Sequence, residues 1–265
     1  YAVKQAKKVL IGICNALTVL HDRGIIHRDV KPENVFVSNG SDEVLNFAFM
    51  AFGGEMAFAD ITYGFYPIYA RLYGAQAKVI PLEADFTLDP EKYFGQEGLI
   101  VIANPNAPTG LCISLSQMES ILQANPDTVV AIDEAYVDFG GQSALPLVAK
   151  YDNLLVTRTF SKSRCLAGGR LGYAFASAGI ISDLEKVCDY ITFIKDGRII
   201  FSAEKERLTE QYGILRCSNS DFEKIDKSAV IAFNQNSFST DALVHRSRIE
   251  GDYIIDKANV EDIML

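Results

Sequence analysis

Residues 128–136 read Thr-Val-Val-Ala-Ile-Asp-Glu-Ala-Tyr, a short apolar run that ends in polar groups. Such a run predicts a strand buried on both faces of a sheet. A second buried strand is predicted at Leu99–Ala103, and a helical pattern with apolar positions at 115, 118, 121 and 122 lies between the two. Strands that alternate with helices favour an α/β fold whose sheet is mostly parallel and covered on both faces.

The same alternation extends in both directions along the chain. Further strands are predicted at 35–38, 154–156 and 173–176, and an amphipathic helix at 3–20. After residue 38, the turn Asn39-Gly40-Ser41-Asp42 leads into a helix, for which we expect Ser41 or Asp42 to be the cap.

From about residue 182 the pattern changes. The apolar runs 190–194 and 198–201 flank Lys195-Asp196-Gly197, which predicts a β-hairpin. A charged helix at 203–212 and short strands at 214–217 and 229–233 are expected to follow. This tail is therefore predicted to be a small α+β unit that does not continue the central sheet.

Composition excludes several classes of protein. With 49% hydrophobic and 22% charged residues, the 265-residue chain resembles a globular soluble protein, and its net charge of −9 disfavours nucleic-acid binding. The sequence contains no stretch of 18 apolar residues, so no membrane span is predicted. Three histidines and five scattered cysteines have no metal-ligand or disulfide spacing, which favours a reducing cytoplasm and predicts no metal site.

A cofactor site is indicated by polar residues that follow the predicted strands. Lys162, in Thr-Phe-Ser-Lys-Ser-Arg (159–164), can form an imine with an aldehyde cofactor and then move a proton. Asp133 follows a buried strand, at the sheet edge where ligands of α/β folds bind. A carboxylate there keeps a pyridine nitrogen protonated, and Tyr136 can hydrogen-bond the phenolic oxygen of the ring. These are requirements of pyridoxal phosphate.

The phosphate of such a cofactor also has candidate partners. Gly40, Ser41 and Asp42 open a helix after a strand, so their amide groups and the helix dipole can hold an anion. Ser161 and Arg170 add a hydroxyl and a cation. Tyr63 is a candidate to stack on the ring.

Each of these signals has an ordinary alternative. A Ser-x-Lys or Asn-Gly-Ser word is more often a simple turn, and Asp133 can merely cap a loop. The tyrosines at 63, 66, 69 and 73 are equally consistent with core or interface aromatics. The order and spacing of the residues together favour the cofactor site.

Residues 35–181 resemble the large domain of a fold-type-I pyridoxal-phosphate aminotransferase of class I/II, most closely the histidinol-phosphate aminotransferase family. The matching words are Val-Ser-Asn-Gly-Ser-Asp-Glu (37–43), Asp-Ile-Thr-Tyr-Gly-Phe-Tyr (60–66), Asn-Pro-Asn-Ala-Pro-Thr-Gly (104–110), Asp-Glu-Ala-Tyr (133–136) and Thr-Phe-Ser-Lys…Leu-Ala-Gly-Gly-Arg (159–170). The resemblance implies a three-layer domain that transfers an amino group between glutamate and the keto form of histidinol phosphate. It also implies a role in histidine biosynthesis, as a cytoplasmic homodimer.

Two departures from that family matter. Ala107 stands before Pro-Thr-Gly, where the family often has an asparagine for the phenolic oxygen, and Asn106 is a candidate substitute. No segment matches the family's small domain, which carries the arginine for the substrate carboxylate. We therefore expect impaired turnover.

The two ends resemble other families. His27-Arg28-Asp29-Val30-Lys31-Pro32-Glu33-Asn34 is similar to a protein-kinase catalytic loop, and residues 182–265 are similar to the end of an ABC-transporter ATPase. Neither a glycine-rich kinase loop nor a Walker phosphate loop occurs in the chain, which disfavours ATP-dependent chemistry.

These likenesses predict three segments: a kinase-like helix and loop at 1–34, an incomplete aminotransferase large domain at 35–181, and an ATPase-like α+β tail at 182–265. The words at the two joins, 30–35 and 182–187, suit both neighbouring families. The hypothesis that follows is a chimera of spliced fragments. The alternative to an aminotransferase is then a non-catalytic mosaic.

Overall fold

The computed structural model describes residues 35–195, 198–251 and 253–258. The chain divides into two compact units, residues 1–187 and 188–265. The helix predicted at 3–20 and the kinase-like loop lie outside the described residues. Within the described part of the chain, no helix is long and apolar enough to cross a membrane.

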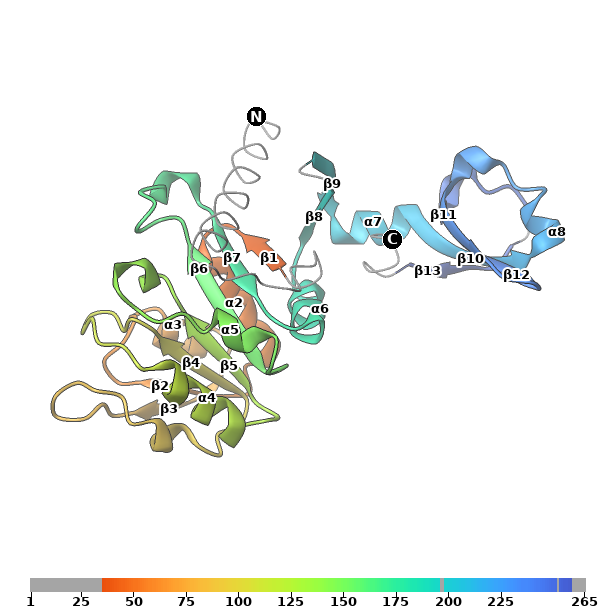
Figure 1. The fold of residues 1–265 in the computed structure, drawn as a ribbon. Helices are drawn as coiled ribbons and strands as arrows, with labels where there is room; N and C mark the ends of the chain where they lie inside the picture. Colours follow the sequence, from red (N-terminus) through yellow and green to blue (C-terminus); the bar gives the residue numbers. More distant parts are fainter. Residues whose placement is uncertain (1–34, 196–197, 252, 259–265) are drawn as a thin grey trace. The chain divides into compact units, whose positions relative to one another are not determined.

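The first unit is built on a seven-stranded sheet with the order β1-β7-β6-β5-β4-β2-β3 (Figure 1). Its strands are β1 (Val35–Ser38), β2 (Glu55–Ala59), β3 (Gln76–Ile80), β4 (Leu99–Ala103), β5 (Val129–Asp133), β6 (Leu154–Thr159) and β7 (Gly172–Phe175). Only β7 runs against its neighbours, since it is antiparallel to both β1 and β6, whereas the pairings from β6 to β3 are parallel.

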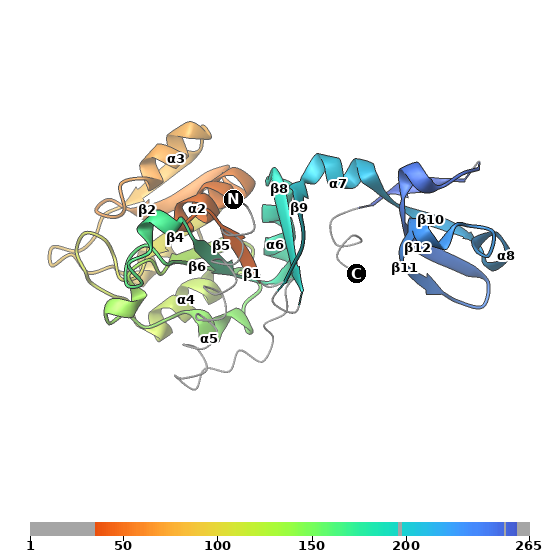
Figure 2. The same ribbon diagram turned by 90° about the horizontal axis from the view of Figure 1, so that it is seen from above.

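Helices cover both faces of this sheet, as Figure 2 shows from above. One face packs on α2 (Ser41–Phe52), α3 (Tyr66–Leu72) and α6 (Ala178–Lys186), and the other on α4 (Leu115–Ala124) and α5 (Leu145–Val148). Short 3₁₀ turns lie at η2 (Pro90–Tyr93), η3 (Val137–Phe139) and η4 (Ala167–Gly169). The arrangement is the three-layer α/β domain that the sequence predicts.

The alternation of strand side chains explains the two cores. In β4, Leu99 and Val101 point into the layer of α2 and α3, while Ile100 and Ile102 point into the layer of α4. All four are nearly inaccessible to solvent. A strand buried on both faces reads as a continuous apolar run because each face supplies its own hydrophobic layer.

Local sequence signals explain where individual helices begin. Ser114 caps α4 by accepting from the amide of Gln117, whose side chain in turn accepts from the amide of Ser114. This reciprocal pair is a capping box. Ser177 caps α6 in the simpler way, by accepting from the amide of Ile180.

The expected cap of α2 is wrong. Gly40 is the N-cap residue, with φ 84°, and no side chain caps the helix, while Ser41 and Asp42 already belong to its first turn. The positive φ is open to glycine without strain, so the chain turns there on backbone geometry instead of a side-chain hydrogen bond.

The second unit contains the predicted hairpin, formed by β8 (Tyr190–Lys195) and β9 (Arg198–Glu204). Helix α7 (Lys205–Gln211) follows, then a four-stranded antiparallel sheet with the order β11-β12-β10-β13. The bounds are β10 (Tyr212–Ser218), α8 (Asn219–Phe222), η5 (Lys227–Ala229), β11 (Val230–Gln235), β12 (Ser239–His245), η6 (Arg246–Arg248) and β13 (Ile255–Lys257). Leu215, Phe222 and Val244 contribute to its own small core.

Candidate active site

Three parallel strands of the first unit end at one edge of the sheet. Ala103 pairs with Asp133, and Asp133 pairs with Thr157, so the loops that follow β4, β5 and β6 leave the sheet side by side. Strand β1 joins them because Ser38 pairs with Gly172 of β7, and Gly172 also pairs with Thr159 of β6. This edge is where open α/β sheets bind ligands.

The N-terminus of α2 lies against the start of β7. A Cβ on Gly172 would lie 2.1 Å from the carbonyl carbon of Gly40 and 2.2 Å from the amide nitrogen of Ser41. A Cβ on Gly40 would meet the Arg170 guanidinium at 2.7 Å. Two glycines therefore bring the first turn of an uncapped helix next to a cation, and such a helix end favours an anion.

Arg170 holds the other side of this turn. Its Nη2 donates to the carbonyl of Asn39 at 3.2 Å and lies 3.7 Å from the Asp42 carboxylate. The guanidinium is about half exposed, with 47% of the side chain accessible, so it can still contact a ligand. Its backbone is left-handed, with φ 46°.

Asp133 is buried at the end of β5, with 5% of the residue exposed. Its Oδ2 accepts from the hydroxyl of Tyr66 at 2.8 Å, and its Oδ1 accepts from the amide of Ala135 at 3.1 Å and the hydroxyl of Thr157 at 3.3 Å. Burial raises the pKa of this carboxyl, and the three donors act in the opposite direction. A carboxylate has about four acceptor sites, so one remains, on Oδ2.

Tyr63 connects the first turn of α2 with the aromatic rings of α3. Its hydroxyl donates to Asp42 Oδ1 at 3.0 Å, and its ring meets the ring of Tyr66 edge-on, with centroids 5.6 Å apart. Burial and the Asp42 carboxylate raise the pKa of Tyr63 well above its ordinary value, which keeps the phenol protonated.

Lys162 lies in the loop that follows β6, and its ammonium sits 5.0 Å from the centroid of the Tyr136 ring. A cation over an aromatic face at this distance is weakly attracted. Lys162 is exposed, so its amine is accessible from solvent.

Two predicted residues take other partners. The side-chain amide of Asn106 donates to the Ile61 carbonyl at 2.9 Å and to the Thr109 hydroxyl at 3.1 Å. The hydroxyl of Ser161 accepts from that of Thr159 at 2.9 Å. Both stay near the edge of the sheet that carries the other candidates, because Asn106 follows β4 and Ser161 follows β6.

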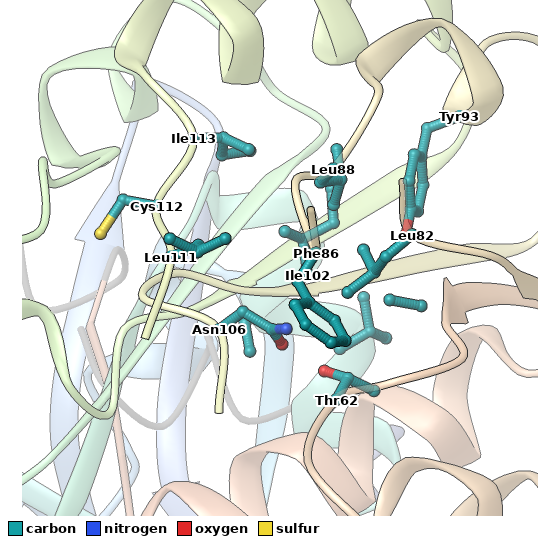
Figure 3. A pocket seen from close by; sticks show the side chains of 13 residues that line it. Thr62, Leu82, Phe86, Leu88, Tyr93, Ile102, Asn106, Leu111, Cys112 and Ile113 are labelled. Atoms are coloured by element: carbon teal, nitrogen blue, oxygen red, sulfur yellow. The ribbon is translucent and has the colours of Figure 1, made fainter. Parts of the chain in front are cut away.

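A mostly apolar pocket borders Asn106, lined by side chains that include Leu82, Phe86, Leu111 and Ile113 (Figure 3). Tyr93 also lines it. Tyr93 is 1% exposed, and its hydroxyl has no hydrogen-bond partner among the described residues. The pocket offers room for about one water molecule, since its volume is about 20 Å³.

The sequence reasoning missed the residues that support Asp133. These are Tyr66 and Thr157. It also missed a buried ion pair next to Asp133 in sequence: Oε2 of Glu134, the residue after β5, is 2.7 Å from Nη2 of Arg158 in β6. The amide of Ala144 donates to the other oxygen of Glu134 at 2.6 Å. Tyr66 could have been found from its position three residues after Tyr63, because residues with this spacing at a helix start lie on the same face. No local signal pairs Glu134 with Arg158. Among the described residues, no group of three or more His, Cys, Asp or Glu side chains can hold a metal ion.

The family profile "Aminotransferase class I and II" matches residues 13–203. Histidinol-phosphate aminotransferase of Lactococcus lactis subsp. cremoris strain SK11 is 55% identical over 164 residues, which are 61% of this chain and 46% of that protein. Its counterpart in Acinetobacter baumannii strain AYE is 49% identical over 173 residues, 64% of this chain and 48% of that protein. The chain thus spans about half the length of the curated relatives it matches.

Solved structures share the fold. Histidinol-phosphate aminotransferase of Clostridium acetobutylicum superposes with a TM-score of 0.54 at 22% identity, covering 58% of this chain and 48% of that one. A double mutant of Thermus thermophilus aspartate aminotransferase gives a TM-score of 0.57 at 22% identity, covering 69% and 49%. These likenesses establish the fold-type-I architecture alone.

Proposed function

We propose that this chain, which belongs to the aminotransferase class I and II family of pyridoxal-phosphate enzymes, carries the cofactor site of a histidinol-phosphate aminotransferase. The reaction is the transfer of an amino group between glutamate and the keto form of histidinol phosphate, in histidine biosynthesis. The observation that carries the proposal is the convergence of a buried carboxylate, an exposed lysine and an uncapped helix N-terminus on one edge of the sheet.

The residues present fit the cofactor. Asp133 keeps one acceptor site on Oδ2, which suits the N–H of a protonated pyridine ring. Because Gly172 has no Cβ, β7 lies in backbone contact with the start of α2, and the first turn of that helix has no side-chain cap. Arg170 is half exposed beside that turn. A ring nitrogen, a phosphate and an aldehyde therefore each have a partner of matching chemistry.

The phosphate would be held by the amides of Ser41 and Asp42, with Arg170 and the Ser161 hydroxyl. Gly40 shapes the turn, and its own amide donates to the Ser38 carbonyl at 2.9 Å. The carboxylate of Asp42 would itself repel a phosphate, so we assign it an indirect role. It accepts from Tyr63 at 3.0 Å and lies 3.7 Å from Arg170, and in this way it orients both side chains. Tyr63 is assigned to the face of the ring. Asn106 is assigned to its phenolic side, where it would exchange its bond to the Ile61 carbonyl or to the Thr109 hydroxyl for one to the phenolic oxygen.

Bound pyridoxal phosphate supplies an aldehyde that reacts with amines and a ring that takes up electrons. Lys162 would supply the amine that holds the aldehyde, and once the substrate amine has displaced it, the freed Nζ would accept the proton from the substrate α-carbon and return it. Asp133 holds the proton on the ring nitrogen, and Tyr136 donates its hydroxyl hydrogen to the phenolic oxygen. Nζ lies 5.0 Å from the centroid of the Tyr136 ring, which supports assigning both side chains to the same end of the cofactor.

We further propose a homodimer located in the cytoplasm. Phe65, the N-cap residue of α3, and Ile68 and Leu72 within the helix recur at three- and four-residue spacings and are 46%, 51% and 66% exposed. An apolar stripe of this kind on a biosynthetic enzyme favours a protein partner, and a second copy is the simplest one.

For the chain as a whole, we propose the three segments 1–34, 35–181 and 182–265, joined as a chimera. Words shared with two families at both joins support this, and the second join falls inside α6. A single long DNA read across both joins in the source organism tests it. An uninterrupted natural gene with this sequence would refute the chimera.

Cofactor binding tests the main proposal. After incubation with pyridoxal phosphate and removal of unbound cofactor by desalting, the purified chain should stay yellow, and borohydride should remove the colour and leave the cofactor covalently attached. Lys162→Ala should abolish the colour. Lys150→Ala is the matched control, because Lys150 is exposed and pairs with Glu119 on the outer helix α4. A parent chain that is colourless after incubation with excess cofactor and desalting contradicts the assignment.

A further inference from the structure

Tyr66 reaches Asp133 across a large separation in the chain. The two residues are 67 positions apart, they are 0% and 5% exposed, and Tyr66 Oη donates to Asp133 Oδ2 at 2.8 Å. The ring of Tyr66 is packed against Phe49, Phe58 and Tyr63, with centroids 5.6 to 6.1 Å apart. A hydroxyl on a ring held in this way has a single position.

The contact bears on the charge of Asp133. A carboxylate that pairs with a protonated ring nitrogen has to be ionised, but burial raises the pKa of Asp133. Hydrogen bonds to the charged form favour ionisation, and Tyr66 is the first of the three donors that lower this pKa. The other two act on Oδ1, so Tyr66 alone among these donors orients Oδ2.

Other groups of the described residues face Asp133 from the surrounding elements. Thr157 of β6 donates to Oδ1, while the carboxylate of Asp42 on α2 raises the Asp133 pKa by charge repulsion. Tyr63, just before α3, and Tyr69 within it are both neutral phenols whose pKa values lie above the ordinary one. Of the two hydroxyl groups that donate to Asp133, Tyr66 makes the shorter bond and so favours the ionised carboxylate more, whereas the nearby charge of Asp42 opposes ionisation.

We propose that Tyr66 is a positioning residue for amino-group transfer: its hydroxyl holds Asp133 Oδ2 in the orientation and the ionised form that receive the ring nitrogen of the cofactor. This role rests on the proposed function. Tyr66 acts through Asp133 and touches neither cofactor nor substrate.

The test compares Tyr66→Phe with Tyr73→Phe. Tyr73 also loses one phenol hydrogen bond, to Asn46 Oδ1 at 2.8 Å, but that bond involves no carboxylate. The first measurement is the pKa of Asp133 in the cofactor-free chain, from the carboxyl ¹³C shift. Tyr66→Phe should raise it by about one unit, and Tyr73→Phe should leave it unchanged.

The second measurement is the affinity for pyridoxal phosphate as a function of pH, followed by the yellow absorbance. Tyr66→Phe should weaken binding about tenfold, and the loss of affinity on acidification should begin at a higher pH than in the parent. In an Asp133→Asn background, adding Tyr66→Phe should have no further effect, because the ionisable partner is gone.

An unchanged Asp133 pKa in a folded Tyr66→Phe variant overturns the inference. An Asp133 pKa that rises equally in Tyr66→Phe and Tyr73→Phe also overturns it. If the parent binds cofactor and Tyr66→Phe binds it with the parent's pH profile, the inference fails and the proposed function stands. A parent that binds no cofactor overturns both. Should Tyr66→Phe fail to fold, 3-fluorotyrosine at position 66 provides the test, because it keeps the ring and makes the hydroxyl a stronger donor. The Asp133 pKa should then fall, and an unchanged pKa overturns the inference.

Discussion

The backbone of Gly172 touches the backbone of Gly40, so that a Cβ on Gly172 would lie 2.1 Å from the Gly40 carbonyl carbon. This contact joins the first residue of β7 to the N-cap of α2, although 132 positions separate them in the numbering. It sets the place of the helix N-terminus that we assign to the cofactor phosphate.

Gly172→Ala should therefore destabilise the chain. The added methyl meets main-chain atoms, which cannot move without displacing β1 or α2, and overpacking of this kind costs about 1 to 3 kcal/mol. Urea unfolding measures the free-energy change. Gly168→Ala is the control, because a Cβ there has nothing within 4 Å. Equal stabilities for the two variants would contradict the close contact.

Asp133→Asn should stabilise the cofactor-free chain at neutral pH while weakening cofactor binding. Burial raises the folded-state pKa of Asp133 above its unfolded value of 3.8, so the folded chain binds this proton more tightly. The stability contribution is therefore greatest below the unfolded pKa and falls as pH rises through the folded pKa.

Unfolding measurements at a series of pH values between acid and neutral check the sign of this effect. The parent should lose stability relative to Asp133→Asn as the pH rises. Asp127→Asn, a carboxyl-to-amide change in the turn just before β5, is the control and should follow the parent. A parent that gains stability relative to Asp133→Asn over this range would contradict the prediction.

Tyr93→Phe should stabilise the chain by about 1 kcal/mol, because it removes a buried hydroxyl that has no hydrogen-bond partner among the described residues. Thermal unfolding gives the change. Tyr151→Phe is the matched control and should not stabilise, since the Tyr151 hydroxyl donates to Glu119 at 2.9 Å and accepts from Gln123 at 2.8 Å. A destabilised Tyr93→Phe would indicate that a bound water satisfies the hydroxyl.

Ile68→Glu should convert the proposed dimer to a monomer, because it places a charge within the apolar stripe of α3. Sedimentation velocity measures the mass at a fixed protein concentration. Ile231→Glu, at a similarly exposed position in β11 of the second unit, should leave the association unchanged. A parent chain that sediments as a monomer would refute the dimer without bearing on the cofactor site.

Much of the first unit could be predicted from local pattern. The strands predicted at 35–38, 99–103 and 154–156 are found at 35–38, 99–103 and 154–159. The helix predicted around apolar positions 115–122 spans 115–124. The hairpin of the second unit also agrees with its turn signal. Strands β2 and β3 and helix α3 were missed. Four of the five residues of β3 are exposed, so it has no continuous apolar run, and α3 has only seven residues.

Part of the candidate site could also be predicted from local sequence, and part could not. The sequence by itself determined which groups follow each strand: Asp133 after an apolar run, Lys162 after the next, and Gly40 at a strand-to-helix turn. Parallel pairing then obliges the loops after β4, β5 and β6 to share one edge. For this reason, spacing along the chain was enough to nominate the lysine and the carboxylate.

Only the tertiary structure decided what holds those groups. The hydroxyl of Tyr66 meets Asp133, the backbones of Gly40 and Gly172 touch, and Arg158 neutralises Glu134, all across distant parts of the chain. Such contacts depend on strand order and on the layer in which each helix packs. Neither is encoded in the periodicity of a single segment, because periodicity specifies which face of an element is buried and leaves its neighbour undetermined.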